Sequence, residues 1–205
     1  LIAQVRQYPE LLGAPRFWFY ALAVMFASGA FYAFLGGAPF VGTEIHGLSP
    51  EALGLFFGSA ALGFLVGNGI AGRWSARVGM NQMALAGAMV GTVGLGINWG
   101  LHLVGLGGVW VFFGFTTFLG LGNGLLMPNA NAGMLSVRPH LAGSASGLGG
   151  AVGLAGGAAL SSYAGTLMTV EDGAAPLLAL MTALSALSIL CVVLVMRRER
   201  QLGLG

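Results

Sequence analysis

The fold class is decided by residues 78–137, which read VGMNQMALAGAMVGTVGLGINWGLHLVGLGGVWVFFGFTTFLGLGNGLLMPNANAGMLSV without one Asp, Glu, Lys or Arg. A helix rising about 1.5 Å per residue crosses a hydrocarbon core of about 30 Å in roughly 20 residues, so this stretch holds two membrane spans. His102 and the glycines after it mark the turn between them. Four other uncharged stretches hold one span each: 17–43, 52–72, 139–170 and 173–196. The sequence therefore predicts an all-α membrane protein with six transmembrane helices.

The charges predict the orientation of these helices. All eight basic residues are arginines. They precede the first span, separate the second from the third and the fourth from the fifth, and follow the sixth: Arg6, Arg16, Arg73, Arg77, Arg138, Arg197, Arg198 and Arg200. In the other connections every charged residue is acidic: Glu44, Glu51, Glu171 and Asp172. Short arginine-rich loops stay in the cytoplasm, so both termini are expected to be cytoplasmic.

The same pattern predicts the division of the chain. We expect a cytoplasmic connector at residues 1–16, a six-helix transmembrane domain at 17–196 and a cytoplasmic tail at 197–205. The expected spans are 17–41, 52–72, 82–101, 108–130, 141–168 and 175–196. The first residues read as a connector rather than a beginning, which suggests a piece of a longer protein.

Composition excludes several other classes of protein. Charged residues make up 7% of the chain, against about 25% in a soluble domain. The arginines are spread over four segments and form no stripe, so we expect no nucleic-acid partner. Cys191 is the single cysteine, and no Asp, Glu, Lys or Arg lies within an expected span. We therefore expect no enzyme, metal site or cofactor.

Small residues recur at every fourth position on two of the expected helices. In the fifth span they include Gly149, Gly153 and Gly157, and in the second span Gly63 and Gly67. Small side chains allow helix backbones to approach closely in a membrane. These glycines are therefore predicted to form helix-packing interfaces, with a sliding or rocking contact as the functional alternative.

Polar, aromatic and helix-breaking residues within the spans suggest a cavity. Asn123 and Asn129 lie in the fourth span, where an amide without a partner is costly in hydrocarbon. Tyr32 and Phe34 precede Pro39, which removes a backbone donor near the outer end of the first span. These five residues are the predicted substrate-cavity residues. Helix-to-helix hydrogen bonding is the alternative role of the asparagines.

Two stretches resemble the major facilitator superfamily. Gly72, Arg73, Arg77 and Gly79 look like its Gly-x-x-x-Asp-Arg-x-Gly loop signature, with Ala76 in place of the aspartate. The junction of the fourth and fifth spans resembles the C-terminal half of Bcr/CflA-type drug-resistance transporters. The residues that carry this second resemblance are Gly120, Gly124, Pro128, Asn129, Ala130, Asn131, Ala132, Ala142, Gly143, Ser144, Ala145 and Ser146.

The resemblance implies a twelve-helix proton-coupled antiporter of the bacterial inner membrane, of which this chain matches the second half. It implies that the first and fourth helices line a central cavity, while the second and fifth meet the other half. The implied partners are a lipophilic substrate, membrane lipid and an N-terminal six-helix half, and the proton-carrying acid is expected in that half. Two alternatives stay open: a half-transporter that works as a homodimer, and a membrane scaffold without transport activity.

Overall fold

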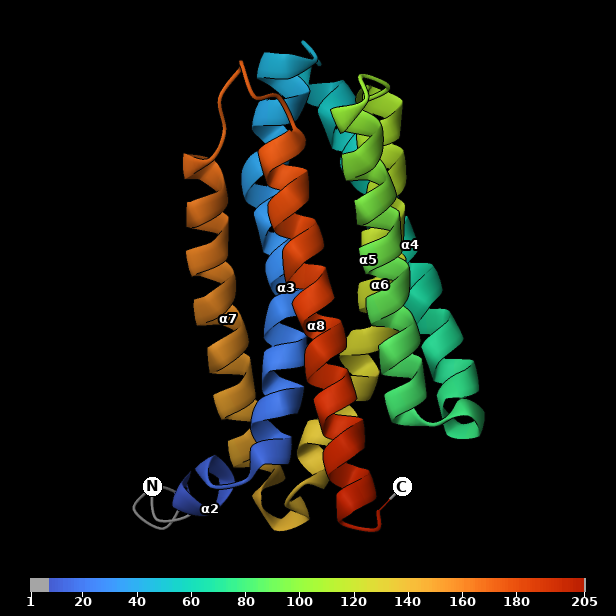
Figure 1. The fold of residues 1–205 in the computed structure, drawn as a ribbon, viewed down its shortest axis with the longest axis vertical. Coiled ribbons are helices and arrows are strands. Elements are labelled where there is room, and N and C mark those ends of the chain that lie inside the picture. The colour runs from blue at the N-terminus through green and yellow to red at the C-terminus, as the bar shows by residue number, and fades with distance from the viewer. Residues whose placement is uncertain (1–7, 205) are drawn as a thin grey trace.

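The structure, a computed structural model, describes residues 8–204 (Figure 1). Its elements are α2 (Tyr8–Leu12), α3 (Pro15–Phe40), the π-helical turn η1 (Val41–Ile45), α4 (Pro50–Val78), α5 (Met80–Leu103), α6 (Val109–Ser136), the 3-10 turn η2 (Pro139–Leu141), α7 (Ala142–Thr166) and α8 (Ala175–Gln201). Residues 8–204 contain no β-strand. Each of the six expected spans falls on one of the long helices α3 to α8, which confirms the all-α class.

Five segments are long and apolar enough to cross a membrane: Pro15–Ile45, Pro50–Val78, Met80–Leu103, Val109–Ser136 and Ala175–Gln201. α7 is not among them, although it has 25 residues. Glycine and serine replace larger apolar side chains along much of α7, which lowers its hydropathy. The chain is therefore a multi-pass membrane protein in which five helices meet the criterion of length and composition.

Local sequence explains where the helices begin and end. Pro50 opens α4, and the Ser49 hydroxyl accepts a hydrogen bond from the Ala52 N–H at 3.3 Å. A proline at the first helical position costs little because its missing N–H would have no helical partner. Gly79 separates α4 from α5 with φ at +98°, a conformation that glycine adopts without steric cost. A single residue can therefore reverse the chain between two long helices.

The long helices form two groups that lie side by side. α3 packs on α7 and α8, while α6 packs on α4 and α5 (Figure 1). Contacts between α3 and α6 and between α5 and α8 join the two groups. α3 and α6 consequently lie at the centre of the molecule, and α7 lies at its edge beside α3.

Glycines set the close approach of α4 and α6. Gly63 faces the backbone of α6 at Thr117, and Gly120 faces the carbonyl of Ala60. A Cβ atom at either glycine would overlap backbone atoms of the facing helix. Dispersion between closely spaced backbones is the main attraction between helices in lipid, so these positions require glycine for packing.

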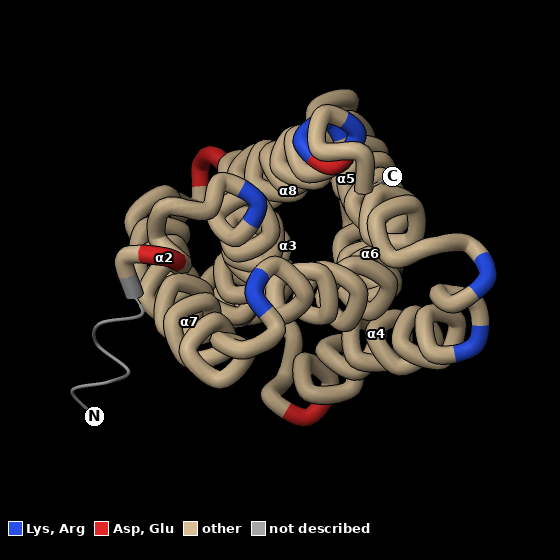
Figure 2. The backbone as a smooth tube through the Cα atoms, turned by 90° about the horizontal axis from the view of Figure 1, so that it is seen from below, with Lys and Arg blue, Asp and Glu red and all other residues tan. Residues whose placement is uncertain are grey.

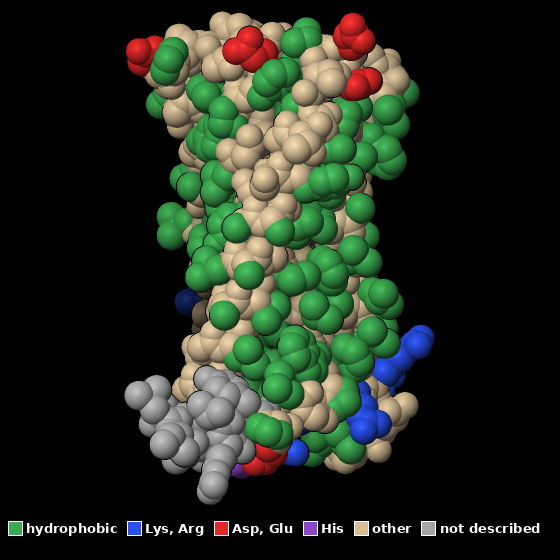
Figure 3. Space-filling model, turned by 90° about the vertical axis from the view of Figure 1, so that its left-hand side faces the viewer, with side chains coloured by type: hydrophobic (Ala, Val, Ile, Leu, Met, Phe, Trp, Pro, Cys, Tyr) green, Lys and Arg blue, Asp and Glu red, His purple; other side chains and the backbone are tan. Residues whose placement is uncertain are grey.

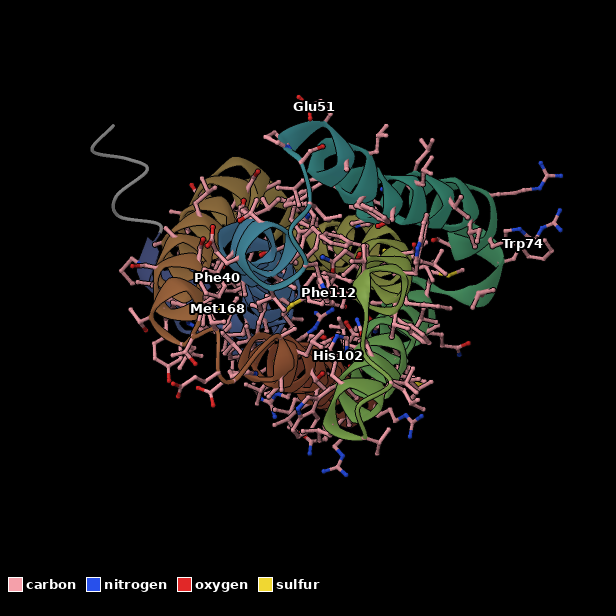
Figure 4. All side chains as sticks on the ribbon, turned by 90° about the horizontal axis from the view of Figure 1, so that it is seen from above. Phe40, Glu51, Trp74, His102, Phe112 and Met168 are labelled. Carbon is pink, nitrogen blue, oxygen red and sulfur yellow. The ribbon has the colours of Figure 1, made fainter. Side chains whose placement is uncertain are left out.

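Aromatic side chains fill the core near one end of the bundle. Phe34 of α3 lies at ring-centroid distances of 4.9 Å from Phe57 and 6.3 Å from Phe113. Phe112 and Phe113 form an edge-to-face pair at 4.9 Å, and His102 lies beside Phe112 (Figure 4). Such ring pairs add to the burial energy of the side chains. This aromatic core therefore joins α3, α4 and α6 at that end.

Charged side chains lie at the two ends of the bundle (Figure 3). At one of these ends Glu10 and Glu199 pair with Arg138 and Arg16. The acidic end carries Glu44, Glu51, Glu171 and Asp172, and the other end, seen in Figure 2, is the arginine end. The helix ends that meet there carry Arg16, Arg73, Arg77, Arg138, Arg197, Arg198 and Arg200. Arg6 lies outside the described residues. The arginines of the described residues thus gather at one end, and the loops whose charged residues are all acidic gather at the other.

Candidate functional site

A mostly apolar hollow of about 320 Å³ lies between α3, α4 and α6. We call it the Asn123 hollow. It is lined by Ser28, Phe31, Tyr32, Ala60, Ala61, Phe64, Gly120, Asn123 and Met127. Its volume is within the range of about 300–1,000 Å³ that is usual for small-molecule sites.

A second hollow of about 360 Å³ lies between α3, α6 and α7. We call it the Asn131 hollow. Its lining is Val24, Ser28, Tyr32, Met127, Asn131, Met134, Leu135, Ser146, Gly149, Gly150, Gly153 and Leu154. Ser28, Tyr32 and Met127 belong to both linings. The two hollows therefore meet at α3 and α6, the central helices of the bundle.

Packing fixes the side chains at the meeting point. The ring of Tyr32 lies against Gly157 of α7, where a Cβ atom would overlap it. Asn123 donates a hydrogen bond from Nδ2 to the carbonyl of Ala27 at 3.1 Å, which joins α6 to α3. Ser28 donates its hydroxyl proton within α3, to the carbonyl of Val24 at 2.7 Å. Asn123 and Tyr32 are thus held by partners on adjacent helices, and Ser28 by partners within α3.

The linings of both hollows hold no Asp, Glu, Lys, Arg or His. Their polar side chains are Ser28, Tyr32, Asn123, Asn131 and Ser146. Apolar surface with a few fixed polar groups binds uncharged or weakly polar ligands well, because burying an unpaired charge is costly. Within residues 8–204, no group of three or more His, Cys, Asp or Glu could hold a metal ion.

The predicted cavity residues are divided between the hollows and the core. Tyr32 and Asn123 line the Asn123 hollow. Phe34 is fully buried in the aromatic core, and Asn129 is buried with its amide bonded to the Leu125 carbonyl at 2.7 Å. Pro39 lies in the last turn of α3 near the acidic end. These last three residues line neither hollow.

The predicted packing glycines also lie in different surroundings. Gly149 and Gly153 line the Asn131 hollow, where Gly149 faces Met134 and Gly153 has open space around it. Gly157 receives the Tyr32 ring, whereas Gly63 and Gly67 face the α6 backbone. The stripe on α7 therefore faces the interior of the chain along part of its length.

Sequence reasoning passed over Ser28, Phe31 and Met127 as cavity residues. Ser28 precedes Tyr32 by four positions, which places both on one face of a helix. That spacing was the available signal. Phe31 and Met127 carry no comparable mark, because an apolar residue in an apolar span gives no indication of which face it lies on.

A polar cluster outside the two hollows joins three helices at the arginine end. Glu199 of α8 is 8% exposed and forms an ion pair with Arg16 of α3. Asn81 of α5 donates to the same carboxylate, and the Tyr20 hydroxyl lies 2.6 Å from Asn81 Oδ1 and 3.1 Å from Glu199 Oε1. The ring of Tyr20 packs on Gly133 of α6. The cluster borders a hollow of about 550 Å³.

The residues of the predicted loop signature lie where α4 turns into α5. Gly72 and Arg73 are in the last turns of α4, and Gly79 forms the turn. The guanidinium of Arg77 lies 5.8 Å from the centre of the Trp74 ring, within the range of a cation–π contact. The signature therefore coincides with the sharpest reversal of the chain at the arginine end.

The fold and the hollows define an all-α multi-pass membrane protein with two uncharged hollows between its helices. Residues 2–162 match the Major Facilitator Superfamily, and the chain belongs to this family. Its members are transporters, not enzymes.

A stretch of 91 residues is 33% identical to a protein of Bacillus subtilis (strain 168) named "Uncharacterized MFS-type transporter YdgK". The matched stretch covers 43% of this chain and 23% of that protein, so the chain spans only part of its relative. No solved structure matches the chain.

Proposed function

We propose that this chain is the C-terminal six-helix domain of a proton-coupled multidrug efflux antiporter in a bacterial inner membrane. In this proposal α3 and α6 line a central cavity that opens alternately to the two sides. Its partners are a lipophilic small molecule, membrane lipid and an N-terminal six-helix half, in the same or a separate chain. Membership of a transporter family and the resemblance to Bcr/CflA-type transporters support the proposal.

The observation that carries the proposal is the pair of adjacent hollows on α3 and α6. They are lined by apolar and uncharged polar side chains contributed by four helices. Lipophilic molecules bind surfaces of this kind mainly through burial of apolar area. Tyr32 and Asn123 are the proposed cavity residues that touch substrate, with Phe34, Pro39 and Asn129 shaping the same two helices.

The proposal includes six spans with both termini in the cytoplasm. α7 counts as the sixth span because it is as long as the others and packs along α3. Residues 1–16 would form the connector, 17–196 the membrane domain and 197–205 the tail. The separation of acidic and arginine ends supports this orientation, since arginine-rich loops remain in the cytoplasm.

The outer faces of α4 and α7 are the proposed contact with the N-terminal half. α4 exposes Leu55, Leu62 and Leu65 at 83%, 64% and 68%. The outer glycines of α7, among them Gly143 and Gly147, have no neighbouring atom within 4 Å of an added Cβ. Large apolar side chains on one helix and small ones on the other suit an interface between two helical bundles.

The energy source is proposed to lie outside the two hollows. Neither lining contains a carboxylate or histidine, so the proton-carrying group would come from the other half. Proteoliposomes with a pH gradient test this: the full-length protein should accumulate a lipophilic dye such as ethidium, and the 205-residue chain alone should not. Gradient-driven uptake by the chain alone would contradict the half-domain proposal and favour a homodimer.

A further inference from the structure

We infer that the Asn123 hollow selects its ligand by accepting hydrogen bonds. The ligand class it fits is a flat apolar molecule that carries an N–H or O–H donor and bears no negative charge. This inference rests on the proposed function, because it names the substrate class of the same site.

The orientation of the Asn123 amide is fixed by its partner. Nδ2 donates to the Ala27 carbonyl of α3 at 3.1 Å, and only the nitrogen of the amide can donate to a carbonyl. Oδ1 takes part in no hydrogen bond among residues 8–204, and it is not fully buried, although Asn123 as a whole is only 6% exposed. Because Asn123 lines the hollow, this oxygen is an acceptor available to a ligand.

Ser28 adds a second acceptor next to the first. Its hydroxyl has one proton, which is directed to backbone carbonyls of α3: Val24 at 2.7 Å and Met25 at 3.2 Å. A hydroxyl oxygen that has donated its proton still has lone pairs to accept with. Ser28 lines the same hollow and can therefore accept from a ligand while it keeps its bond within α3. The Tyr32 hydroxyl, which can both donate and accept, is the remaining polar group of the lining.

The walls determine the shape and charge of the ligand. Phe31, Tyr32 and Phe64 present aromatic rings, and the small residues Ala60, Ala61 and Gly120 form the side contributed by α4 and α6. Ring faces carry negative electrostatic potential, which favours cations and donor hydrogens over anions. No positive side chain lines the hollow to compensate a ligand carboxylate, so an anion would lose its hydration without a counter-charge.

Three ligands with one ring system test the inference on purified protein in lipid nanodiscs, with partitioning into empty nanodiscs subtracted. 2-Naphthol has a donor, 2-methoxynaphthalene lacks it, and 2-naphthoate is an anion. We expect 2-naphthol to bind about tenfold more tightly than either of the others, since an acceptor left without a donor loses on the order of tenfold in affinity. Equal affinity for 2-naphthol and 2-methoxynaphthalene, or tightest binding of 2-naphthoate, would overturn the inference.

Substitutions of the lining residues test whether the preference for 2-naphthol arises in the Asn123 hollow. Asn123→Leu removes Oδ1 and should abolish the preference for 2-naphthol while binding of 2-methoxynaphthalene persists. Asn68→Leu on α4 is the matched control, because Asn68 lines neither hollow and its amide donates within its own helix to the Phe64 carbonyl, and it should keep the preference. Asn123→Leu also breaks the bond to Ala27, so Ser28→Ala, whose bonds are all within α3, provides a second variant with an expected partial loss. A preference that survives in both Asn123→Leu and Ser28→Ala would overturn the assignment.

The measurement separates this inference from the proposed function. Binding is measured at equilibrium without any gradient, so equal affinities would refute the acceptor site even in a protein that transports. Conversely, a protein that shows the 2-naphthol preference but moves no dye across a membrane would refute the transport proposal and leave the preference established.

Discussion

At the scale of single residues, Glu199 is a buried charge close to the C-terminal end of the chain. α8 continues to Gln201, so Glu199 lies on a helix and its side chain turns inward to Arg16. The side chains of the pair are only 16% and 11% exposed. Asn81 and the Tyr20 hydroxyl each lie within hydrogen-bond distance of the same carboxylate. A charge pair this enclosed contributes to stability only while both partners are present.

Glu199→Leu should therefore destabilise the protein strongly. It leaves the Arg16 guanidinium enclosed without a counter-charge, and we expect a loss of about 3 kcal/mol in the free energy of unfolding. The double variant Arg16→Met/Glu199→Leu should lose clearly less, because no lone charge remains. Unfolding in detergent measures both, with the exposed Glu171→Gln as control. A double variant as unstable as the single one would contradict the argument.

His46, at the acidic end, should make stability depend on pH. Burial and, to a smaller extent, His102 lower the pKa of His46 below its usual value. Below about pH 6.5 the unfolded chain therefore binds a proton that the folded chain does not, so stability is present above that pH and falls as the pH drops. We expect His46→Gln to lose less stability than the wild type between about pH 7 and about pH 5. Thermal unfolding in detergent checks this, and parallel pH profiles would contradict it.

At the scale of elements, α6 is held by glycines on both of its neighbours. Gly120 meets α4, and Gly122 meets the backbone of α5 at Gly87 and Gly91. Because backbone faces backbone at these points, the helices cannot adjust by moving a side chain. Interhelix spacing in this part of the bundle is therefore set by glycine positions.

Gly120→Ala should separate α4 from α6. The added methyl would overlap the Ala60 carbonyl, and overpacking of this kind costs about 1–3 kcal/mol. Gly69→Ala on α4 is the matched control, because no atom lies within 4 Å of its added Cβ. The measurement is the unfolding midpoint of both variants in detergent. Equal midpoints would show that the α4–α6 contact is looser than described.

At the scale of the whole molecule, the separation of charge predicts which end reaches which side of the membrane. With Cys191 replaced, single cysteines report the orientation. An impermeant thiol reagent on intact cells should label Asp172→Cys at the acidic end and spare Ala76→Cys and His140→Cys at the arginine end. All three positions are exposed on the surface of the chain, so burial does not explain a difference. Labelling of the arginine end alone would reverse the orientation.

The helices themselves could be predicted from the sequence, and the candidate site only in part. Uncharged length and arginine position are local properties of the sequence, and each expected span overlaps one of the six long helices. Hydropathy did not distinguish α7 clearly, since its glycines weaken the apolar signal. Tyr32 and Asn123 were predicted for the cavity, but their partners Ser28 and Met127 were not.

What the sequence determined by itself was thus the helical class, the helix positions and the sidedness of the charge. Only the tertiary structure decided which face of each helix points where. Tyr32 and Phe34 are two positions apart, which is about 200° around a helix, so one lines a hollow while the other enters the aromatic core. Asn123 and Asn129 likewise point about 120° apart around α6. A soluble helix shows in its sequence which face is polar and turned to water, but an apolar helix does not. The rotation of such a helix about its own axis is therefore set by packing against neighbouring helices.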